Sequence, residues 1–494
     1  MLGTIRKFWH DQRGIALLLV SIMLPAIIGF SLLAIDMSRV NNMHNDLQKG
    51  ADGLALAAAA ELDGRTDSIV RADRALSTLV FNKYTFSTAN IPQTLLAAGV
   101  TRTYLRSLPA SDSSPIAAAN IITDEVTDAP NARFIRVTVT PVGFAAIFPA
   151  SFLTGNAANN SFNVGAVSVA GFTSGVCNYT PVFICNPYEM VNGTNAAGGV
   201  TLEQAVADPS IRRRLIELRT VGNNAAYGPG NFGFLAPPST VGNGAQGLAQ
   251  TIATSKPLGC YSSQGVSTKT GQNTGPIQDA FNVRFGIDAS GNGFNSPDYG
   301  PAANVRKGAS ANGNGNQCPK YNQLTFNATG DMGLPRDATT PYMSGRMGDG
   351  NWNLSGYWST NFGGTSYPSS WDTSKPTRYQ VYKYEIANNL VDHASTGGEV
   401  GTPPSSCQPP VTSVDRRLLY GAILNCNALE AAGNDLNGNS TNLPVEAFAS
   451  FFLTEPVAGA NSGGSVFVEL VDVTGRGGQG TLDSFLRDEA QLYR

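Results

Sequence analysis

The sequence predicts an α+β protein: a single N-terminal transmembrane helix continues into a long helix, and a mixed antiparallel-sheet extracytoplasmic domain with long Gly/Asn/Ser-rich loops follows. Three observations support this class: an uncharged apolar run at residues 14–35, apolar residues at helical spacing after it, and segments of alternating polarity beyond residue 130. We expect six regions. They are a cytoplasmic basic tail (1–13), a transmembrane helix (14–35), a post-membrane helix (36–62), a first α+β periplasmic region (63–175), a loop-rich region with cysteines (176–400) and a strand-rich C-terminal region (401–494).

The apolar run is long enough to span a bilayer. From Gly14 to Ile35 it contains no charged side chain. A helix of this length extends about 33 Å, against a hydrocarbon core of roughly 30 Å. Proline and glycine are common in membrane helices, so Pro25 fits this interpretation. The residues expected to mark the anchor are Gly14, Leu19, Pro25, Ile28 and Ile35.

The charges before this run predict its orientation. Arg6, Lys7 and Arg13 precede it, against the single acid Asp11. The positive-inside rule then places the N-terminus in the cytoplasm and everything after Ile35 on the other side of the membrane. A cleaved signal peptide is the alternative. Its apolar region is usually about 7–15 residues and ends in a small-x-small site, whereas residues 36–39 read Asp-Met-Ser-Arg.

An amphipathic helix is predicted directly after the membrane. Apolar residues recur every three or four positions at Met37, Val40, Met43, Leu47, Ala51, Leu54 and Ala58. This stripe packs either on the protein's own domain or on a partner helix, and the sequence leaves both interpretations open.

These segments carry a family resemblance. Residues 13–16 read RGIA, residues 34–39 read AIDMSR and residues 47–57 read LQKGADGLALA. This order resembles the TadE/TadG-like proteins of Flp (tight adherence) pilus assembly, which share an RG-x-x-A start, a membrane helix, an Asp-x-x-Arg exit and an Ala-rich helix. Gly50 and Gly53 stand where that family usually has Ala. The fifth residue after Gly14 is Leu19 rather than the Glu of processed pseudopilins, so the resemblance is to the TadG-like branch.

The resemblance implies a function and a set of partners. It implies a structural or assembly component of a Flp/Tad pilus machinery in the inner membrane. The implied partners are other pilus-assembly proteins, namely pseudopilins, the inner-membrane platform and the secretin. A formal net charge of −3 argues against nucleic acid as a partner.

The rest of the chain alternates between ordered and irregular segments. Helices are expected at 65–80, 201–220 and 482–492, and strands at 133–141, 162–172, 415–426, 445–456 and 465–473, with the apolar stretch GFAAIFPASFL between the first two strands. Residues 221–375 show no sustained period, but their tryptophans and tyrosines favour packed loops over disorder.

Six cysteines suit disulfides in an oxidising periplasm: Cys177, Cys185, Cys260, Cys318, Cys407 and Cys426. Six allow fifteen pairings. We expect neighbours to pair, with Cys177–Cys185 and Cys407–Cys426 as examples, and all six as buried free thiols as the alternative.

No motif predicts catalysis, a metal or a cofactor, and we expect neither an enzyme nor a small-molecule substrate. The sequence GPGNFG at 228–233 satisfies GxGxxG but lacks the strand-turn-helix context of a dinucleotide site, so we interpret it as a turn. Asp288 begins a segment close to the DxSxS metal loop of adhesin-type domains, and Asp349 begins one with oxygen side chains at alternate positions. Two alternatives therefore stay open: a membrane-anchored adhesin or metal-dependent binding module, and a periplasmic enzyme.

Overall fold

In the computed structural model the chain folds into two compact units. Unit 1 contains residues 1–173 and 488–494, and unit 2 contains residues 174–487. The structure describes residues 13–64, 66–78, 82–89, 91–109, 111, 113–149, 151, 155–156, 160–177, 179–222, 225–237, 244–256, 260–262, 265–269, 274–289, 293–312, 317–407, 414–458, 464–474, 479–482 and 486–493. The long helix α2 is followed by mixed sheets and further helices, which confirms the predicted α+β class.

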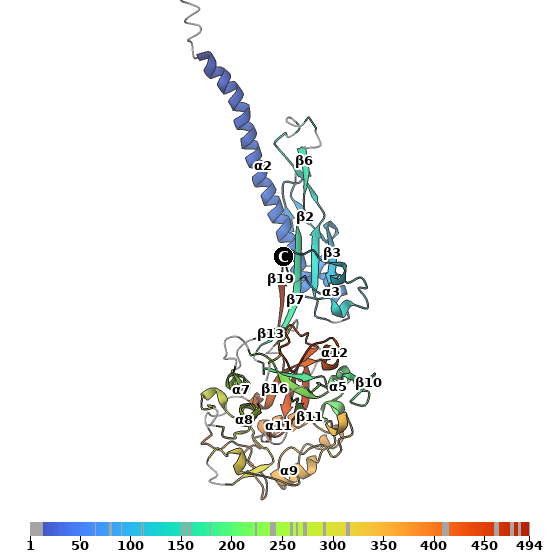
Figure 1. Ribbon diagram of the computed structural model, residues 1–494, viewed down its shortest axis with the longest axis vertical. Coiled ribbons are helices and arrows are strands. Elements are labelled where there is room, and N and C mark those ends of the chain that lie inside the picture. Colours follow the sequence, from blue (N-terminus) through green and yellow to red (C-terminus); the bar gives the residue numbers. More distant parts are fainter. Residues whose placement is uncertain are drawn as a thin grey trace, which may run out of the picture. The chain divides into compact units, whose positions relative to one another are not determined.

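In its described residues, unit 1 combines the α-helices α2 and α3 with small antiparallel sheets (Figure 1). Its elements are α2 (Arg13–Ala59), α3 (Ser68–Thr78), β1 (Asn82–Tyr84), β2 (Gln93–Leu95), β3 (Val100–Leu105), β4 (Phe134–Val139), β5 (Val142–Ala145), β6 (Ser161–Val164), β7 (Val167–Cys177) and β19 (Leu486–Leu492). The main sheet has the order β3-β4-β7, with β19 also paired to β7. Separate hairpins pair β1 with β2 and β5 with β6.

The core of unit 1 forms where α2 crosses this sheet. Strand β4 alternates as its sequence predicts: Ile135, Val137 and Val139 are buried against the apolar side of α2. Phe134 points to the other face, where its ring meets Tyr493 at 5.1 Å between centroids. The period of two therefore gives β4 one face for the helix and one for the C-terminal residues.

Unit 2 is built on a closed six-stranded barrel with the order β11-β12-β8-β16-β17-β18. The strands are β8 (Val182–Cys185), β11 (Leu215–Thr220), β12 (Asn231–Phe234), β16 (Leu418–Leu424), β17 (Ala447–Leu453) and β18 (Val466–Val473). Around it lie α5 (Leu202–Ala207), α6 (Pro209–Arg212), α7 (Ala245–Ala253), α8 (Thr274–Asn282), α9 (Leu354–Phe362), α10 (Trp371–Ser374), α11 (Arg378–Ala387) and α12 (Cys426–Ala431). Short pairings involve β9 (Met190–Val191) with β10 (Thr194–Asn195), β14 (Ala309–Ala311) with β15 (Leu324–Phe326), and β13 (Cys260–Ser262) with the end of β7.

The apolar runs of the C-terminal quarter are buried on both faces. Every residue of β16 and β17 is buried. In β16, Leu419 and Ile423 belong to one core with α7 and α8, while Leu418 and Ala422 belong to a second core with α9 and α11. A strand covered on both sides reads as continuous rather than alternating apolar sequence, which explains the pattern at 415–426.

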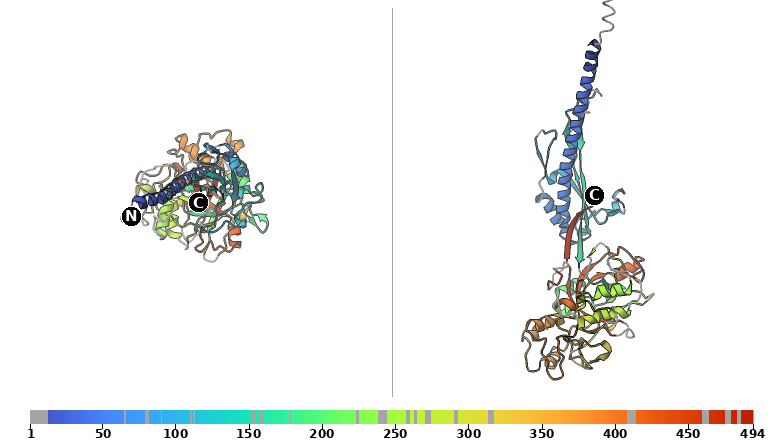
Figure 2. Two further views of the ribbon diagram at one scale, coloured as in Figure 1. Left: turned by 90° about the horizontal axis from the view of Figure 1, so that it is seen from above. Right: turned by 90° about the vertical axis from the view of Figure 1, so that its left-hand side faces the viewer.

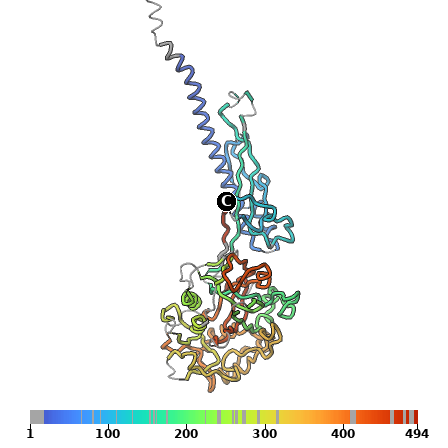
Figure 3. The backbone as a smooth tube through the Cα atoms, in the orientation of Figure 1, coloured from blue at the N-terminus to red at the C-terminus, as the bar shows by residue number. Residues whose placement is uncertain are grey.

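Buried arginines order the irregular part of unit 2, which Figure 3 traces between the barrel segments. Arg416 donates to the carbonyl oxygens of Ala253 and Gly300 at 2.6 and 2.7 Å. Arg417 donates to Leu453 at 3.0 Å. Loops have few regular partners for their carbonyl groups, and a guanidinium with five donors can satisfy several of them at once.

The disulfides join cysteines that are far apart in the sequence. The pairs are Cys177–Cys260, Cys185–Cys426 and Cys318–Cys407. The expected disulfides are confirmed, but the nearest-neighbour pairing is wrong. Cys177 is the last residue of β7, and its antiparallel partner on β13 is Cys260. Cys185 is the last residue of β8, which pairs in parallel with β16, and Cys426 follows β16 in the chain. For these two disulfides, strand pairing and not loop length therefore decides which sulfur atoms meet.

Two predicted helices are wrong in part or entirely. Residues 201–220 begin as α5 and α6 but continue as β11 from Leu215, because Ile216 and Leu218 pair with β18 in the barrel. Residues 486–492 form β19 instead of a helix. These residues pair with β7, and the charged Asp488 interrupts the alternation of Arg487, Glu489 and Gln491 with apolar residues, so the sequence shows no clean period of two.

Candidate membrane-proximal site

Helix α2 is continuous for 47 residues, and most of its residues from 18 to 35 are exposed. The anchor residues Leu19, Ile28 and Ile35 are 54, 50 and 48% exposed, and Pro25 lies inside the helix. Between residues 18 and 35 the exposed apolar surface is interrupted only at Gly29 and Leu32, which are half-covered. By length and composition this helix could cross a membrane. Gly14 lies in its first turn, and the topology residue Arg13 begins it, whereas Arg6 and Lys7 lie outside the described residues.

The second half of α2 is part of the core of unit 1. The fully buried residues on this half are Met43, Leu47, Ala51, Leu54, Ala55, Ala58 and Ala59. They pack with apolar residues of α3, β4 and the hairpin strands. The interpretation that the stripe packs on the protein's own domain is therefore confirmed from Val40 to Ala58, and the partner-helix interpretation is wrong for these residues. Met37, the first residue of the predicted stripe, is 60% exposed and lies outside this core.

Asp36 lies at the junction between the two halves. Its carboxylate is nearly inaccessible, with a side-chain exposure of 7%. Oδ2 accepts hydrogen bonds from the backbone N–H groups of Ile147 and Phe148 at 2.8 and 2.6 Å. Oδ1 accepts one from Arg39 at 2.9 Å, so the buried charge is paired. One acidic side chain thus joins α2 to a loop 111 residues later in the chain.

Arg39 extends this junction towards the core. Its guanidinium lies 4.9 Å from the Phe86 ring centroid and 5.2 Å from that of Phe144. Phe86 has a left-handed backbone (φ 66°), which is unfavourable for a bulky side chain. Cation–π contacts of about 0.5–2 kcal/mol help to hold this conformation. The Asp-x-x-Arg pair therefore joins a charge-assisted contact on one side to an aromatic cluster on the other.

Further contacts join α2 to the chain at the start of β7. Gln48 Nε2 donates to the carbonyl of Val167 at 2.9 Å, and His44 Nδ1 lies 3.0 Å from that of Gly165. A Cβ at Gly50 would lie 2.7 Å from Leu95 Cδ2. Glycine at this position, where the resembled family has alanine, lets the β1–β2 hairpin approach the helix closely.

Sequence reasoning identified the polar pair but not its partner. Asp36 and Arg39 were visible as a family pattern, and GFAAIFPASFL was visible as an apolar stretch. No periodicity connects the two, because their contact depends on where the β5–β6 hairpin ends. A useful signal was that residues 142–166 contain no charged side chain.

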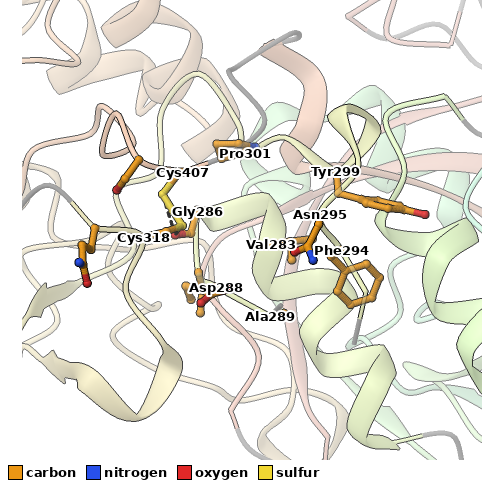
Figure 4. A pocket seen from close by; sticks show the side chains of 13 residues that line it. Val283, Gly286, Asp288, Ala289, Phe294, Asn295, Tyr299, Pro301, Cys318 and Cys407 are labelled. Atoms are coloured by element: carbon orange, nitrogen blue, oxygen red, sulfur yellow. Dashed lines mark hydrogen bonds between the residues drawn. A yellow bond between two sulfur atoms is a disulfide. The ribbon is translucent and has the colours of Figure 1, made fainter. Parts of the chain in front are cut away.

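The other candidate residues lie in unit 2, away from any described metal-ligand cluster. Asp288 follows the 3₁₀ turn Val283–Phe285 and the left-handed Gly286 rather than a buried strand, and it lines a cavity of about 360 Å³ beside Cys318–Cys407 (Figure 4). Asp349 uses its carboxylate internally, accepting from Thr339 Oγ1 at 2.6 Å. Within the described residues no group of three His, Cys, Asp or Glu is placed to hold a metal.

The glycine-rich segment at 228–233 is a turn, as interpreted from the sequence. Gly230 has φ 73°, and the residues after it form β12 rather than a helix. No helix N-terminus is therefore presented to a nucleotide phosphate at this segment.

Comparison with known proteins identifies the N-terminal segment. Residues 14–61 match the family model described as putative Flp pilus-assembly TadE/G-like, which confirms the resemblance of this segment. No curated protein and no solved structure matches the chain. The matched residues begin with the exposed half of α2 and end with its buried half, so they include the whole junction at Asp36 and Arg39.

Proposed function

We propose that the protein is a structural, non-catalytic component of a Flp/Tad-type pilus assembly machinery, of the TadG-like branch. The observation that carries this proposal is the match of residues 14–61 to the TadE/G-like model. These residues form one helix whose exposed half suits a membrane and whose buried half holds a folded unit. The partners are other proteins of that machinery: pseudopilins, the inner-membrane platform and the secretin.

The proposed location is the bacterial inner membrane, with the N-terminus in the cytoplasm and both folded units in the periplasm. Arg6, Lys7 and Arg13 favour this orientation over the reverse. Three disulfides in unit 2 support an oxidising compartment. Residues 36–39 form the buried polar junction of unit 1 rather than a small-x-small cleavage site, which favours an uncleaved anchor.

Two buried acids support a structural rather than catalytic role for the perturbed groups of unit 2. Burial raises the pKa of Glu469 to about 7, against the favourable charge of Arg378. Burial also raises the pKa of Glu189 to about 7. Both carboxyls are at most 3% exposed, and neither lines the cavity beside Asp288. A catalytic acid needs access to its substrate, which these enclosed groups lack.

Deletion and complementation test the pilus role. We expect a strain lacking the protein to lose surface Flp pili, and the wild-type chain to restore them. The double variant Leu19→Arg/Ile28→Arg should not restore them, because each charge at a helix centre costs roughly 2.5–3.5 kcal/mol of membrane insertion. Val126→Arg, at an 83% exposed position of unit 1, is the matched control and should restore pili fully. Normal pili in the deletion strain would refute the proposal.

A second experiment tests the location. A C-terminal alkaline phosphatase fusion should be active, and N-terminal sequencing of the membrane-bound protein should start before Gly14. An inactive fusion would contradict the orientation, and a mature chain that starts near Asp36 would support the signal-peptide alternative.

A further inference from the structure

The β5–β6 hairpin and its loop reach the membrane-spanning part of α2. Figures 1 and 2 show the hairpin running alongside this helix. The chain that forms it, residues 142–164, contains no charged side chain. Ile147 at its described end is 50% exposed, and Phe162 is 46% exposed. Exposed apolar residues on an uncharged hairpin tip are unusual for a surface that faces water.

The level of the contact along α2 is well defined. Phe148 and Pro149 line an apolar cavity with Leu24, Gly29, Leu33 and neighbouring residues of the helix. A Cβ at Gly29 would lie 3.6 Å from Phe148 Cε2. Gly29 precedes Ile35, the last residue of the apolar run, by a helix length of about 9 Å. If the run from Gly14 spans the bilayer, Phe148 lies below its surface.

Two backbone donors at the start of the loop are already satisfied by protein. An unsatisfied backbone N–H in hydrocarbon costs several kcal/mol. The N–H groups of Ile147 and Phe148 are both bonded to Asp36, whose charge is paired with Arg39 on the side facing the domain. Asp36 therefore allows the chain to turn at the membrane boundary without leaving these donors exposed to lipid.

We infer that the hairpin tip at Ile147, Phe148 and Pro149 inserts into the outer leaflet beside α2, with lipid acyl chains as its partner. Asp36 acts as the positioning residue for this second membrane contact. The inference rests on the proposed membrane-spanning role of α2, because the depth of Phe148 is set by that helix. A helix and a hairpin tip together give two points of attachment, which restrict the tilt of unit 1 at the membrane.

Spin-label accessibility in nanodiscs tests the inference with the full chain. Ile147→Cys, labelled with a nitroxide in phosphatidylcholine/phosphatidylglycerol nanodiscs, should collide severalfold more with oxygen than with a water-soluble nickel chelate. The six native cysteines are paired in disulfides and leave the new thiol as the labelling site. Phe30→Cys, at a 74% exposed position of α2, is the lipid reference, and Val126→Cys is the water reference.

The two references separate the possible failures. A lipid-like Phe30 site with a water-like Ile147 site overturns the insertion of the tip and leaves the membrane anchor intact. A water-like Phe30 site contradicts the anchor itself. An Ile147 label that neither reagent reaches would mean burial in protein and would also overturn the lipid contact.

The role of Asp36 has its own readout. Asp36→Ala in the Ile147→Cys background should increase the mobility of the label and reduce its preference for oxygen. Asp36→Asn keeps one oxygen acceptor and should give an intermediate result if the alanine variant does not fold. Asp46→Ala is the control, since this acid lies on the same helix and does not contact the tip. An unchanged spectrum in Asp36→Ala and Asp36→Asn would overturn the positioning role.

Discussion

Units 1 and 2 are stabilised in different ways. Unit 1 contains no cysteine, and its core is assembled around the buried half of α2. Unit 2 contains all six cysteines in three disulfides, together with buried arginines such as Arg378 and Arg417. Unit 1 therefore depends on a helix whose exposed half is long and apolar enough to cross a membrane, whereas unit 2 carries its own crosslinks.

The largest expected effect concerns the crosslinks of unit 2. Cys185→Ser/Cys426→Ser removes the disulfide with the longest sequence separation, 241 residues. For a loop of this length, the chain-entropy model gives a decrease of about 5 kcal/mol in the free energy of unfolding. Three tryptophans lie in unit 2 at Trp352, Trp358 and Trp371, so denaturation followed by their fluorescence should report the loss.

Hydrogen exchange of unit 1 is the control for this variant. Protection of the amides in β3 and β4 should stay as in the wild type, because Cys185 and Cys426 belong to unit 2 and neither lies in β3 or β4. Equal loss of protection in both units would contradict the separation of their stabilities.

Unit 1 should lose stability when its apolar core, rather than a disulfide, is changed. Leu54 is fully buried on α2, and Leu54→Ala should cost about 2–5 kcal/mol through lost contacts and a cavity. Hydrogen exchange should then increase in α3 and β4, while tryptophan fluorescence of unit 2 keeps its midpoint. Asn45→Ala, at an exposed position of the same helix, is the control and should change little.

The elements of unit 1 were more predictable from the sequence than the connections within unit 2. The 3.6-residue stripe of α2 and the period of two in β4 were predictable because each element buries a single face. The junction at Asp36 could not be derived, because its hydrogen bonds depend on the end of a distant hairpin. In unit 2, β16 and β17 were visible as apolar runs, but the disulfide pairing required the strand order of the barrel.

Ordered loops were the least predictable part. Residues 293–312 are tied to a distant loop by side chains such as Arg306, whose guanidinium donates to the carbonyls of Leu390 and His393 at 3.0 and 2.8 Å. Arginine–carbonyl contacts between distant loops leave no periodic trace in a sequence. The tryptophan and tyrosine content indicated packing, but it did not indicate which loops would meet.

The smallest expected effect is a pH dependence confined to unit 2. Glu189 is 3% exposed, and burial, opposed by the N–H of Asn427 and reinforced by the nearby carboxylates Glu446 and Glu430, raises its pKa to about 7. A raised acid binds its proton more tightly in the folded state than in the unfolded state. Its favourable contribution is complete below the unfolded pKa, near 4.5, and is lost as the pH rises to about 7.

The variant Glu189→Gln stays neutral at every pH, so it removes the cost of ionising a buried carboxyl group in the folded state. We expect it to match the wild type near pH 4.5 and to be more stable at pH 8 by up to about 3 kcal/mol, since one pKa unit corresponds to about 1.4 kcal/mol. Denaturant midpoints from tryptophan fluorescence at the two pH values measure the difference. Glu203→Gln, at an exposed position in α5, is the control: it should change the free energy of unfolding by only a few tenths of a kcal/mol, equally at pH 6 and at pH 8. A Glu189→Gln variant that is no more stable than the wild type at pH 8 would show that Glu189 is already solvated and ionised in the folded protein.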